Sequence, residues 1–349
     1  MLFDKIFIEV LKMKNRIVWI DILRIIGIIG VLFMHIVGNT INTYGMQNQN
    51  ANMVYLFFAY FFLFAVPLFV MISGMMFLGR RDITPVKMLN KYCLKIILII
   101  LIIGSGMILM EEVFISKNIS LNIVGVIFNR IITINIWAHM WYLYLILGLY
   151  LITPVLKEIS TRLDKRNYQI FLVVLFILTL VVPSICNYYN VHKVFTYLSL
   201  TCYIFYYFYG YYLYRFDVSK TYKILNYVLS ILQIVNIILY INKYPSLNNL
   251  FSYTSFTPFI LASSIILLMK EKNVDLKYQN IISSIGVCSL GIYVFHQVFI
   301  NIIYKVLKIK LILDYPYVGL ISYILIVFIA SYLFTYLIRK IPIVRKYLI

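Results

Sequence analysis

Residues 17–38 read IVWIDILRIIGIIGVLFMHIVG, a long apolar run that is interrupted by Asp21, Arg24 and His35. About 20 mostly apolar residues carry an α-helix across the roughly 30 Å hydrocarbon core of a bilayer. An ionisable side chain at the centre of such a helix costs about 2.5–3.5 kcal/mol. The run therefore predicts a membrane-spanning helix, and its three ionisable residues are the first candidates for a functional role.

The composition of the whole chain excludes a water-soluble globule. Of its 349 residues, 63% are hydrophobic and 12% are charged. Soluble domains carry about 25% charged residues, and half of that charge cannot cover the surface of a domain of this size. A multi-span membrane protein remains.

Further long apolar stretches follow the first one. Together they predict an all-α polytopic integral membrane protein with about ten transmembrane helices. The stretch 119–136, which contains Arg130, is interrupted and is interpreted as an interfacial or re-entrant segment. The expected spans cover residues 17–38, 53–78, 93–115, 137–156, 168–185, 194–214, 222–241, 251–269, 281–304 and 317–338.

The distribution of the basic residues predicts the orientation. The net charge of +19 comes from 31 lysines and arginines against 12 acidic residues. With the N-terminus taken as cytoplasmic, 23 of the basic residues fall in cytoplasmic segments and 7 in outer ones. Such an excess marks cytoplasmic loops, so the charge is a sign of topology and not of nucleic-acid binding. Both termini are expected in the cytoplasm, with residues 1–16 as a short N-terminal segment.

Arg24 and His35 share one face of the first predicted helix. Eleven residues correspond to about three full turns, and they separate the two side chains by about 16 Å along the helix axis. Asp21 precedes Arg24 by three residues and is placed to pair with it. Each residue also has a structural interpretation: Arg24 can extend to the inner head groups, and His35 can be a buried histidine bonded to a neighbouring helix.

Four phrases along the chain resemble the integral-membrane acyltransferase-three family, which comprises bacterial-type O-acyltransferases that modify cell-surface sugars. The first is the Arg-x10-His pair within IDILRIIGIIGVLFMH (20–35). The others are VPLFVMISGMMF (66–77), HMWYLYLILGLYLITPVL (139–156) and LGIYVFHQ (290–297). Because the four phrases occur in order and the resemblance spans most of the chain, from residue 16 to about 300, the resemblance is specific.

The resemblance implies a membrane acyltransferase with a cytosolic acyl-CoA, acetyl-CoA first among the candidates, as co-substrate and with no permanently bound cofactor or metal. The implied acceptor is a hydroxyl of a polysaccharide or a lipid-linked sugar, which receives an acetyl or succinyl group. On this interpretation Arg24, held by Asp21, meets the donor, and His35 takes the proton of the acceptor hydroxyl. An acyl-histidine intermediate is the alternative.

Two lysines stand near a position where family members usually carry two arginines, three apart, between the second and third spans. Here the segment has Lys91 and Lys95, preceded by Arg80 and Arg81. Lysine can neutralise a phosphate but lacks the planar guanidinium fork of arginine. Lys91 and Lys95 are therefore candidates for donor binding that depart from the family pattern.

Four further residues are candidates for binding donor or acceptor: Ser73, His139, Trp141 and His296. Ser73 and Gly74 also fit a close helix crossing, His139 and Trp141 an aromatic belt at the interface, and His296 a core hydrogen bond. His35, His139 and His296 are expected in the outer thirds of their spans and His192 in an outer loop. This placement suggests acyl transfer towards the outer face.

The chain is expected to form a single transmembrane acyltransferase domain over residues 1–349 in the bacterial plasma membrane. The soluble extracellular domain that is fused to some relatives is expected to be absent. A second interpretation is a polytopic transporter or flippase of a glycan or a small organic acid, because ten spans with a few buried ionisable groups fit that function too. Paired Gly- or Pro-broken spans would favour transport, and the sequence does not have them.

Overall fold

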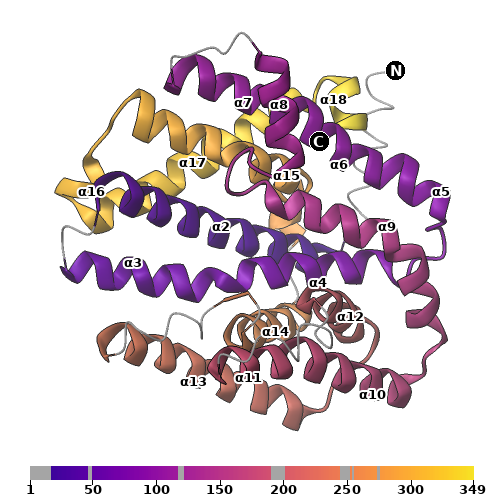
Figure 1. Cartoon of the computed structure of the whole chain (residues 1–349). Helices are drawn as coiled ribbons and strands as arrows, with labels where there is room; N and C mark the ends of the chain where they lie inside the picture. The colour runs from indigo at the N-terminus through magenta and orange to yellow at the C-terminus, as the bar shows by residue number, and fades with distance from the viewer. Residues whose placement is uncertain are drawn as a thin grey trace.

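A computed structural model describes residues 17–45, 49–116, 122–189, 201–243, 252–253, 255–272 and 276–349. Within these ranges every regular element is helical (Figure 1). The predicted all-α class is therefore confirmed. The expected cytoplasmic segment 1–16 and His192 lie outside the described residues.

Eight helices among the described residues are long and apolar enough to cross a membrane. They confirm the predicted multi-pass membrane protein, and they match eight of the ten expected spans. These helices cover α2 (Val18–Tyr44), Ala51–Phe77 in α3 (Gln49–Phe61), η1 (Phe62–Phe64) and α4 (Ala65–Phe77), Pro85–Phe114, α9 (Trp141–Arg162), Lys165–Cys186, Lys220–Ile241 in α13 (Lys220–Lys243), Lys277–Val306 and α17 (Pro316–Ile338).

Several of these long helices contain π segments between α-helical pieces. A π turn admits one extra residue per turn and is frequent at functional sites. The pieces are α5 (Pro85–Lys87), η2 (Met88–Cys93), α6 (Leu94–Leu98), η3 (Ile99–Ile103), α7 (Gly104–Met110), η4 (Glu111–Ser116), α10 (Lys165–Phe176), η5 (Ile177–Val181), α11 (Val182–Tyr189), α15 (Leu276–Asn301) and η7 (Ile302–Val306).

The two remaining expected spans are represented by shorter helices, α12 (Cys202–Arg215) and α14 (Phe256–Lys270). About two thirds of the residues of each helix are buried by other helices. Parts of the expected spans 194–214 and 251–269 lie outside the described residues, so the count of ten stays a prediction. Helix α8 (Ile123–Ile132) is too short to cross a bilayer, in agreement with the interfacial or re-entrant interpretation of 119–136.

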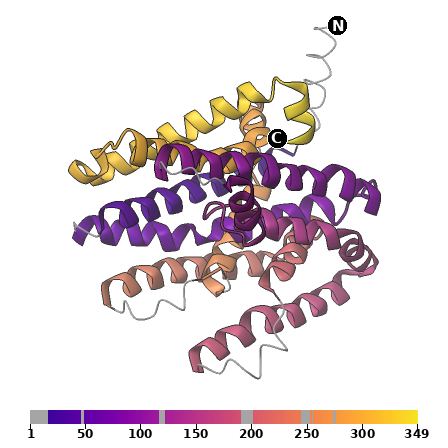
Figure 2. The ribbon, with the colours of Figure 1, turned by 45° about the horizontal axis from the view of Figure 1, so that its top comes forward.

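The helices are arranged in layers (Figure 2). Helices α2 and α3 run side by side, with α17 beyond α2 and α13 beyond α3 (Figure 1). Helix α15 packs against both α2 and α17, and thereby connects the first long helix to the last long helix. The short helices α16 (Leu311–Asp314) and α18 (Pro342–Tyr347) flank α17.

Helices α4 and α12 cross in direct backbone contact. A Cβ atom on Gly74 would lie 1.9 Å from the carbonyl oxygen of Tyr207, and one on Gly210 would lie 2.2 Å from that of Met71. Only glycine permits such an approach, which is how small residues bring membrane helices together. The interpretation of Gly74 as a close helix crossing is confirmed.

Several basic loops meet at one end of the bundle, which we call the basic end and define by the loops 78–84, 163–164, 216–219 and 271–272. Lys157 donates to the carbonyl oxygen of Ile83 (2.9 Å), Arg215 to that of Ser160 (2.8 Å) and Lys270 to that of Leu213 (2.9 Å). These loops are among those that the charge distribution predicts to be cytoplasmic. Their grouping at one end of the bundle agrees with that prediction.

Candidate active site

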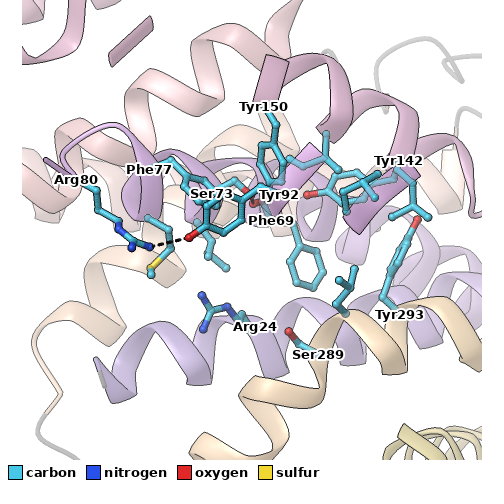
Figure 3. A pocket seen from close by; sticks show the side chains of 16 residues that line it. Arg24, Phe69, Ser73, Phe77, Arg80, Tyr92, Tyr142, Tyr150, Ser289 and Tyr293 are labelled. Atoms are coloured by element: carbon cyan, nitrogen blue, oxygen red, sulfur yellow. Dashed lines mark hydrogen bonds between the residues drawn. The ribbon is translucent and has the colours of Figure 1, made fainter. Parts of the chain in front are cut away.

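A cavity of about 300 Å³ opens between α2, α4, η2, α9 and α15 (Figure 3). Arg80 lies at its basic end, and Tyr142 and Tyr293 lie at the other end in the view of Figure 3. Apolar side chains from α4 and α9 form most of the wall between. The cavity thus presents cations near the basic end and aromatic rings deeper in the membrane.

Arg24 projects into this cavity from α2 and is paired with Asp21 on the preceding turn (Figure 3). The carboxylate of Asp21 is 1% exposed, and Gly286 of α15 packs against it so closely that a Cβ would lie 2.5 Å from its Cγ. A buried carboxylate bonded to a guanidinium fixes the position of that guanidinium. The predicted Asp21–Arg24 pair is therefore present.

Arg80 supplies a second guanidinium at the basic end of the cavity. It donates two hydrogen bonds to Asp82 (3.0 and 2.7 Å) and one to the hydroxyl of Tyr92 (3.4 Å). Hydrogen bonds from Arg80 and Lys87 hold the pKa of Asp82 well below its usual range, and the bond to Asp82 raises the pKa of Arg80. Arg80 precedes the two predicted lysines in the sequence and was not among the predicted site residues. Its position, three residues after the end of the apolar stretch that forms α4, is the feature of the sequence that could have indicated a place at the cavity.

The predicted lysines do not line the cavity. Lys91 is exposed, with its ammonium group 5.6 Å from the centre of the Tyr92 ring, and Lys95 is half-buried on α6. Among the cationic residues that the structure describes, Arg24 and Arg80 are the ones that line this cavity. Arg24 thus lies where it was predicted, and Arg80, in place of Lys91 and Lys95, is the second cation at the cavity.

Of the other candidates, Ser73 lines the cavity and Trp141 does not. The Ser73 hydroxyl donates to the carbonyl oxygen of Phe69 (3.0 Å), one turn earlier on α4. The ring of Trp141 packs against those of Tyr142, Tyr203 and Tyr253. This packing agrees with the interpretation of Trp141 as part of an aromatic belt.

Three histidines from distant parts of the chain meet in one cluster. The ring centre of His35 lies 5.1 Å from that of His296 and 6.1 Å from that of His139, and the last two are 4.9 Å apart. His139 precedes α9, and His296 lies on α15; both are buried. The structure therefore brings together three predicted site residues that the sequence separates.

The hydrogen bonds of His139 and His296 fix which ring nitrogen carries the proton. Nε2 of His139 lies 3.1 Å from the carbonyl oxygen of Val294, and Nδ1 of His296 lies 2.6 Å from that of Tyr293. A carbonyl only accepts, so in a neutral ring these nitrogens donate. Nδ1 of His139 and Nε2 of His296 then keep lone pairs, and both are buried without a hydrogen-bond partner in the described residues.

Amide side chains continue the polar surface from the histidine cluster towards the end opposite the basic end. Asn39 lies one turn beyond His35 on α2 and accepts a hydrogen bond from Gln297 of α15 (3.4 Å). One further turn along α15 is Asn301, which is buried. The side-chain oxygens of Gln297 and Asn301 are buried without a partner in the described part of the chain. Sequence analysis did not select these amides.

Tyr293 separates the cavity from the histidine cluster. Its ring lines the cavity, with its centre 5.7 Å from that of His139 and 5.9 Å from that of His296. Its hydroxyl donates to the carbonyl oxygen of His139. His35 itself does not line the cavity. In the described residues no group of three His, Cys, Asp or Glu side chains is placed to hold a metal ion.

Comparison with known proteins gives one family. A family model described as an acyltransferase domain matches residues 17–340, nearly the whole chain. No curated protein and no solved structure matches. The family match covers every element of the cavity and all three clustered histidines. The chain therefore belongs to the acyltransferase-3 family, and it is a multi-pass membrane acyltransferase.

Proposed function

We propose that this protein is an O-acyltransferase of the bacterial plasma membrane. It moves an acetyl or succinyl group from cytosolic acyl-CoA to a hydroxyl of a cell-surface polysaccharide or a lipid-linked glycan. The observation that carries the proposal is an apolar cavity with two guanidinium groups at its basic end and, at its other end, the ring of Tyr293 packed against a cluster of three histidines. Residues 1–349 act as one transmembrane domain.

The donor enters from the basic end. Arg24 and Arg80 bind the phosphates of acyl-CoA, because a guanidinium matches a phosphate in both charge and bidentate geometry. The pantetheine arm, which carries few charges, extends along the cavity between α4 and α9. This direction brings the thioester to Tyr293, next to the histidines. Ser73 lies along the way and can bond an amide of that arm.

His35 is the general base of this proposal. The acceptor hydroxyl attacks the carbonyl carbon of the thioester, so that a C–O bond forms and the C–S bond breaks. The hydroxyl proton passes to the ring of His35 and then to the sulfur of the departing CoA. Nδ1 of His139 or Nε2 of His296, which lack a partner in the described residues, can accept a hydrogen bond from the N–H group of His35. The other ring nitrogen of His35 is then free to accept the proton of the acceptor hydroxyl.

An acyl-histidine intermediate at His35 uses the same groups in two steps. In that case the ring nitrogen attacks the thioester first, and the acceptor hydroxyl then removes the acyl group from the ring. The two routes differ in one observable. Incubation with labelled acyl-CoA in the absence of acceptor leaves label on the protein only in the two-step route.

The acceptor approaches from the side opposite the donor. Asn39, Gln297 and Asn301 form the polar surface next to the histidines on that side, and hydroxyl-rich ligands are bound by such amides. Oxygens of Gln297 and Asn301 that lack a partner can accept hydrogen bonds from sugar hydroxyls. This arrangement supports transfer towards the outer face, as the positions of the histidines in the sequence predict.

The test uses the purified full chain with radiolabelled acetyl-CoA or succinyl-CoA and candidate glycans. We expect label in the glycan with the wild type and none above background with His35→Ala. Equal transfer by both proteins would remove His35 from the mechanism. Concentration of a glycan or small acid inside vesicles, without consumption of acyl-CoA, would favour the transporter instead.

A further inference from the structure

A second cavity, of about 590 Å³, lies between α10, α12, α13 and α14. It is separated from the first cavity by the crossing of α4 and α12, where the two backbones touch. None of the residues that line it lines the first cavity. It is therefore a different site, and nothing in the proposed acyl transfer uses it.

The two ends of this cavity differ in polarity. The end at the basic end of the bundle is polar, with Lys165, Gln169 and Ser219. The deeper part is apolar, and it is lined by Leu172, Phe176, Phe205 and Phe259 among others. The residues that α10 contributes follow one helix face, because they recur at intervals of three and four positions.

The depth of the cavity corresponds to one leaflet. Lys165 and Phe176 are eleven residues apart on α10, which is about 16 Å along the axis. The hydrocarbon core of a bilayer is about 30 Å thick, so the cavity extends from head-group level to near the middle. Val173 lines it and is 57% exposed, so the cavity opens on the lipid-facing surface.

The tyrosine hydroxyls around the cavity are already bonded. Tyr209 and Tyr222 bond each other, and Tyr212 accepts a hydrogen bond from Gln169 (2.8 Å). They therefore offer little to a polar ligand in the apolar part of the cavity. A hydrocarbon chain is the occupant that suits such walls.

Basic side chains outnumber acidic ones around the entrance: Lys165, Arg166 and Lys220 stand beside Asp164 and Asp217, and the Asp217 carboxylate is already paired with Lys270. Lys165 donates one hydrogen bond to the carbonyl oxygen of Asp217 (2.7 Å), which leaves two of the three ammonium hydrogens for a ligand. Arg166 and Lys220, next to lining residues, are exposed and form no ion pair with any carboxylate that the structure describes. Such an entrance complements a phosphate.

We propose that this cavity binds one anionic glycerophospholipid from the leaflet at the basic end. One acyl chain lies between α10 and α13 against Phe176 and Phe259, and the phosphate rests on Lys165. The site is independent of the acyl transfer proposed above. Its ligand is held by shape and charge, and no chemistry is done on it.

The experiment is native mass spectrometry of the delipidated full chain, to which dioleoyl phosphatidylglycerol or dioleoyl phosphatidylcholine is added at equal concentration. We expect one tightly retained phosphatidylglycerol in the wild type and none in Val173→Trp, because the indole fills the cavity. Val174→Trp is the matched control. Val174 is on the same helix and 49% exposed but does not line the cavity, so this variant retains the lipid.

A second variant tests the charge at the entrance. Lys165→Gln lowers the affinity for phosphatidylglycerol about fivefold and lowers that for phosphatidylcholine less, because the choline cation offsets the charge of its phosphate. The site is disproved if Val173→Trp, eluting as a folded monodisperse protein, retains the lipid as the wild type does. Equal retention of both lipids by the wild type would disprove an anionic ligand. Neither result depends on acyl-transfer activity, so this proposal and the function fail separately.

Discussion

The ring centres of His35 and His296 are 5.1 Å apart, so α2 and α15 meet in a contact between two imidazoles. His139 completes the cluster from the residues that precede α9. A buried polar group costs free energy unless it is bonded, yet one nitrogen on each of His139 and His296 lacks a partner in the described residues. A site that keeps such groups is arranged for a ligand or for a proton.

His35→Ala should lower the turnover of acyl transfer by about 10²- to 10⁴-fold, which is the range for the loss of a general base. The KM for acyl-CoA should change little, because on the proposed mechanism the phosphates bind at Arg24 and Arg80. The measurement is the initial rate against acyl-CoA concentration, together with the melting temperature in detergent. A large rise in KM at unchanged turnover would show that His35 binds the donor instead.

Arg24→Gln should raise the KM for acyl-CoA and also destabilise the protein. The loss of one partner of a buried ion pair costs about 3–5 kcal/mol, because the carboxylate of Asp21 loses the guanidinium that faces it. The double variant Asp21→Asn, Arg24→Gln should recover stability but not donor affinity. Recovery of both would mean that Arg24 has a structural role only.

Asp82 should remain ionised across the neutral range, since hydrogen bonds from Arg80 and Lys87 hold its pKa below the usual value. A carboxyl whose pKa is lowered by folding contributes stability above its unfolded pKa, about 4, and this stability is lost as the pH falls. Between pH 5 and 9 the contribution is constant. Melting temperatures of the wild type and Asp82→Asn should therefore differ by a constant amount in that range and converge at lower pH.

Gly74→Ala should destabilise the protein by about 3 kcal/mol or more, since the new methyl group would overlap the carbonyl oxygen of Tyr207. The matched control is Gly148→Ala on α9, where no atom lies within 4 Å of the position of the added carbon. That variant should be neutral or slightly more stable. Similar melting temperatures for both variants would contradict the close crossing.

Asn301→Leu should raise the KM for the glycan two- to tenfold, the usual effect of one lost hydrogen bond. Stability should not fall, because the substitution removes a buried oxygen that has no partner in the described residues. The rate of acyl-CoA hydrolysis without glycan should stay the same. An altered hydrolysis rate with an unaltered glycan KM would place Asn301 on the donor side.

The sequence predicts the class of the fold well, because the membrane imposes a length and a polarity on each long helix. It predicts α12 less well. The tyrosines of that helix lower its hydropathy, and its surroundings of other helices tolerate them. Burial inside a bundle removes the requirement that a residue dissolve in lipid, so hydropathy locates the ends of such a helix poorly.

The first helix of the candidate site was also predictable. The spacing within one helix fixes the common face of Arg24 and His35 and the pair that Arg24 forms with Asp21. The contacts between helices were not predictable in this way. No local pattern indicates that His139 and His296 touch His35, or that Arg80 lines the cavity while Lys91 and Lys95 do not.

One phenol ring lies between the two halves of the candidate site. Tyr293 closes the deep end of the first cavity, and its hydroxyl holds the backbone of His139. On the proposed mechanism, a thioester that travels inward displaces this ring and so disturbs the imidazole behind it. The proposal then makes the position of Tyr293 decide both how well the bound donor is protected from hydrolysis and when the histidines can act on an incoming sugar.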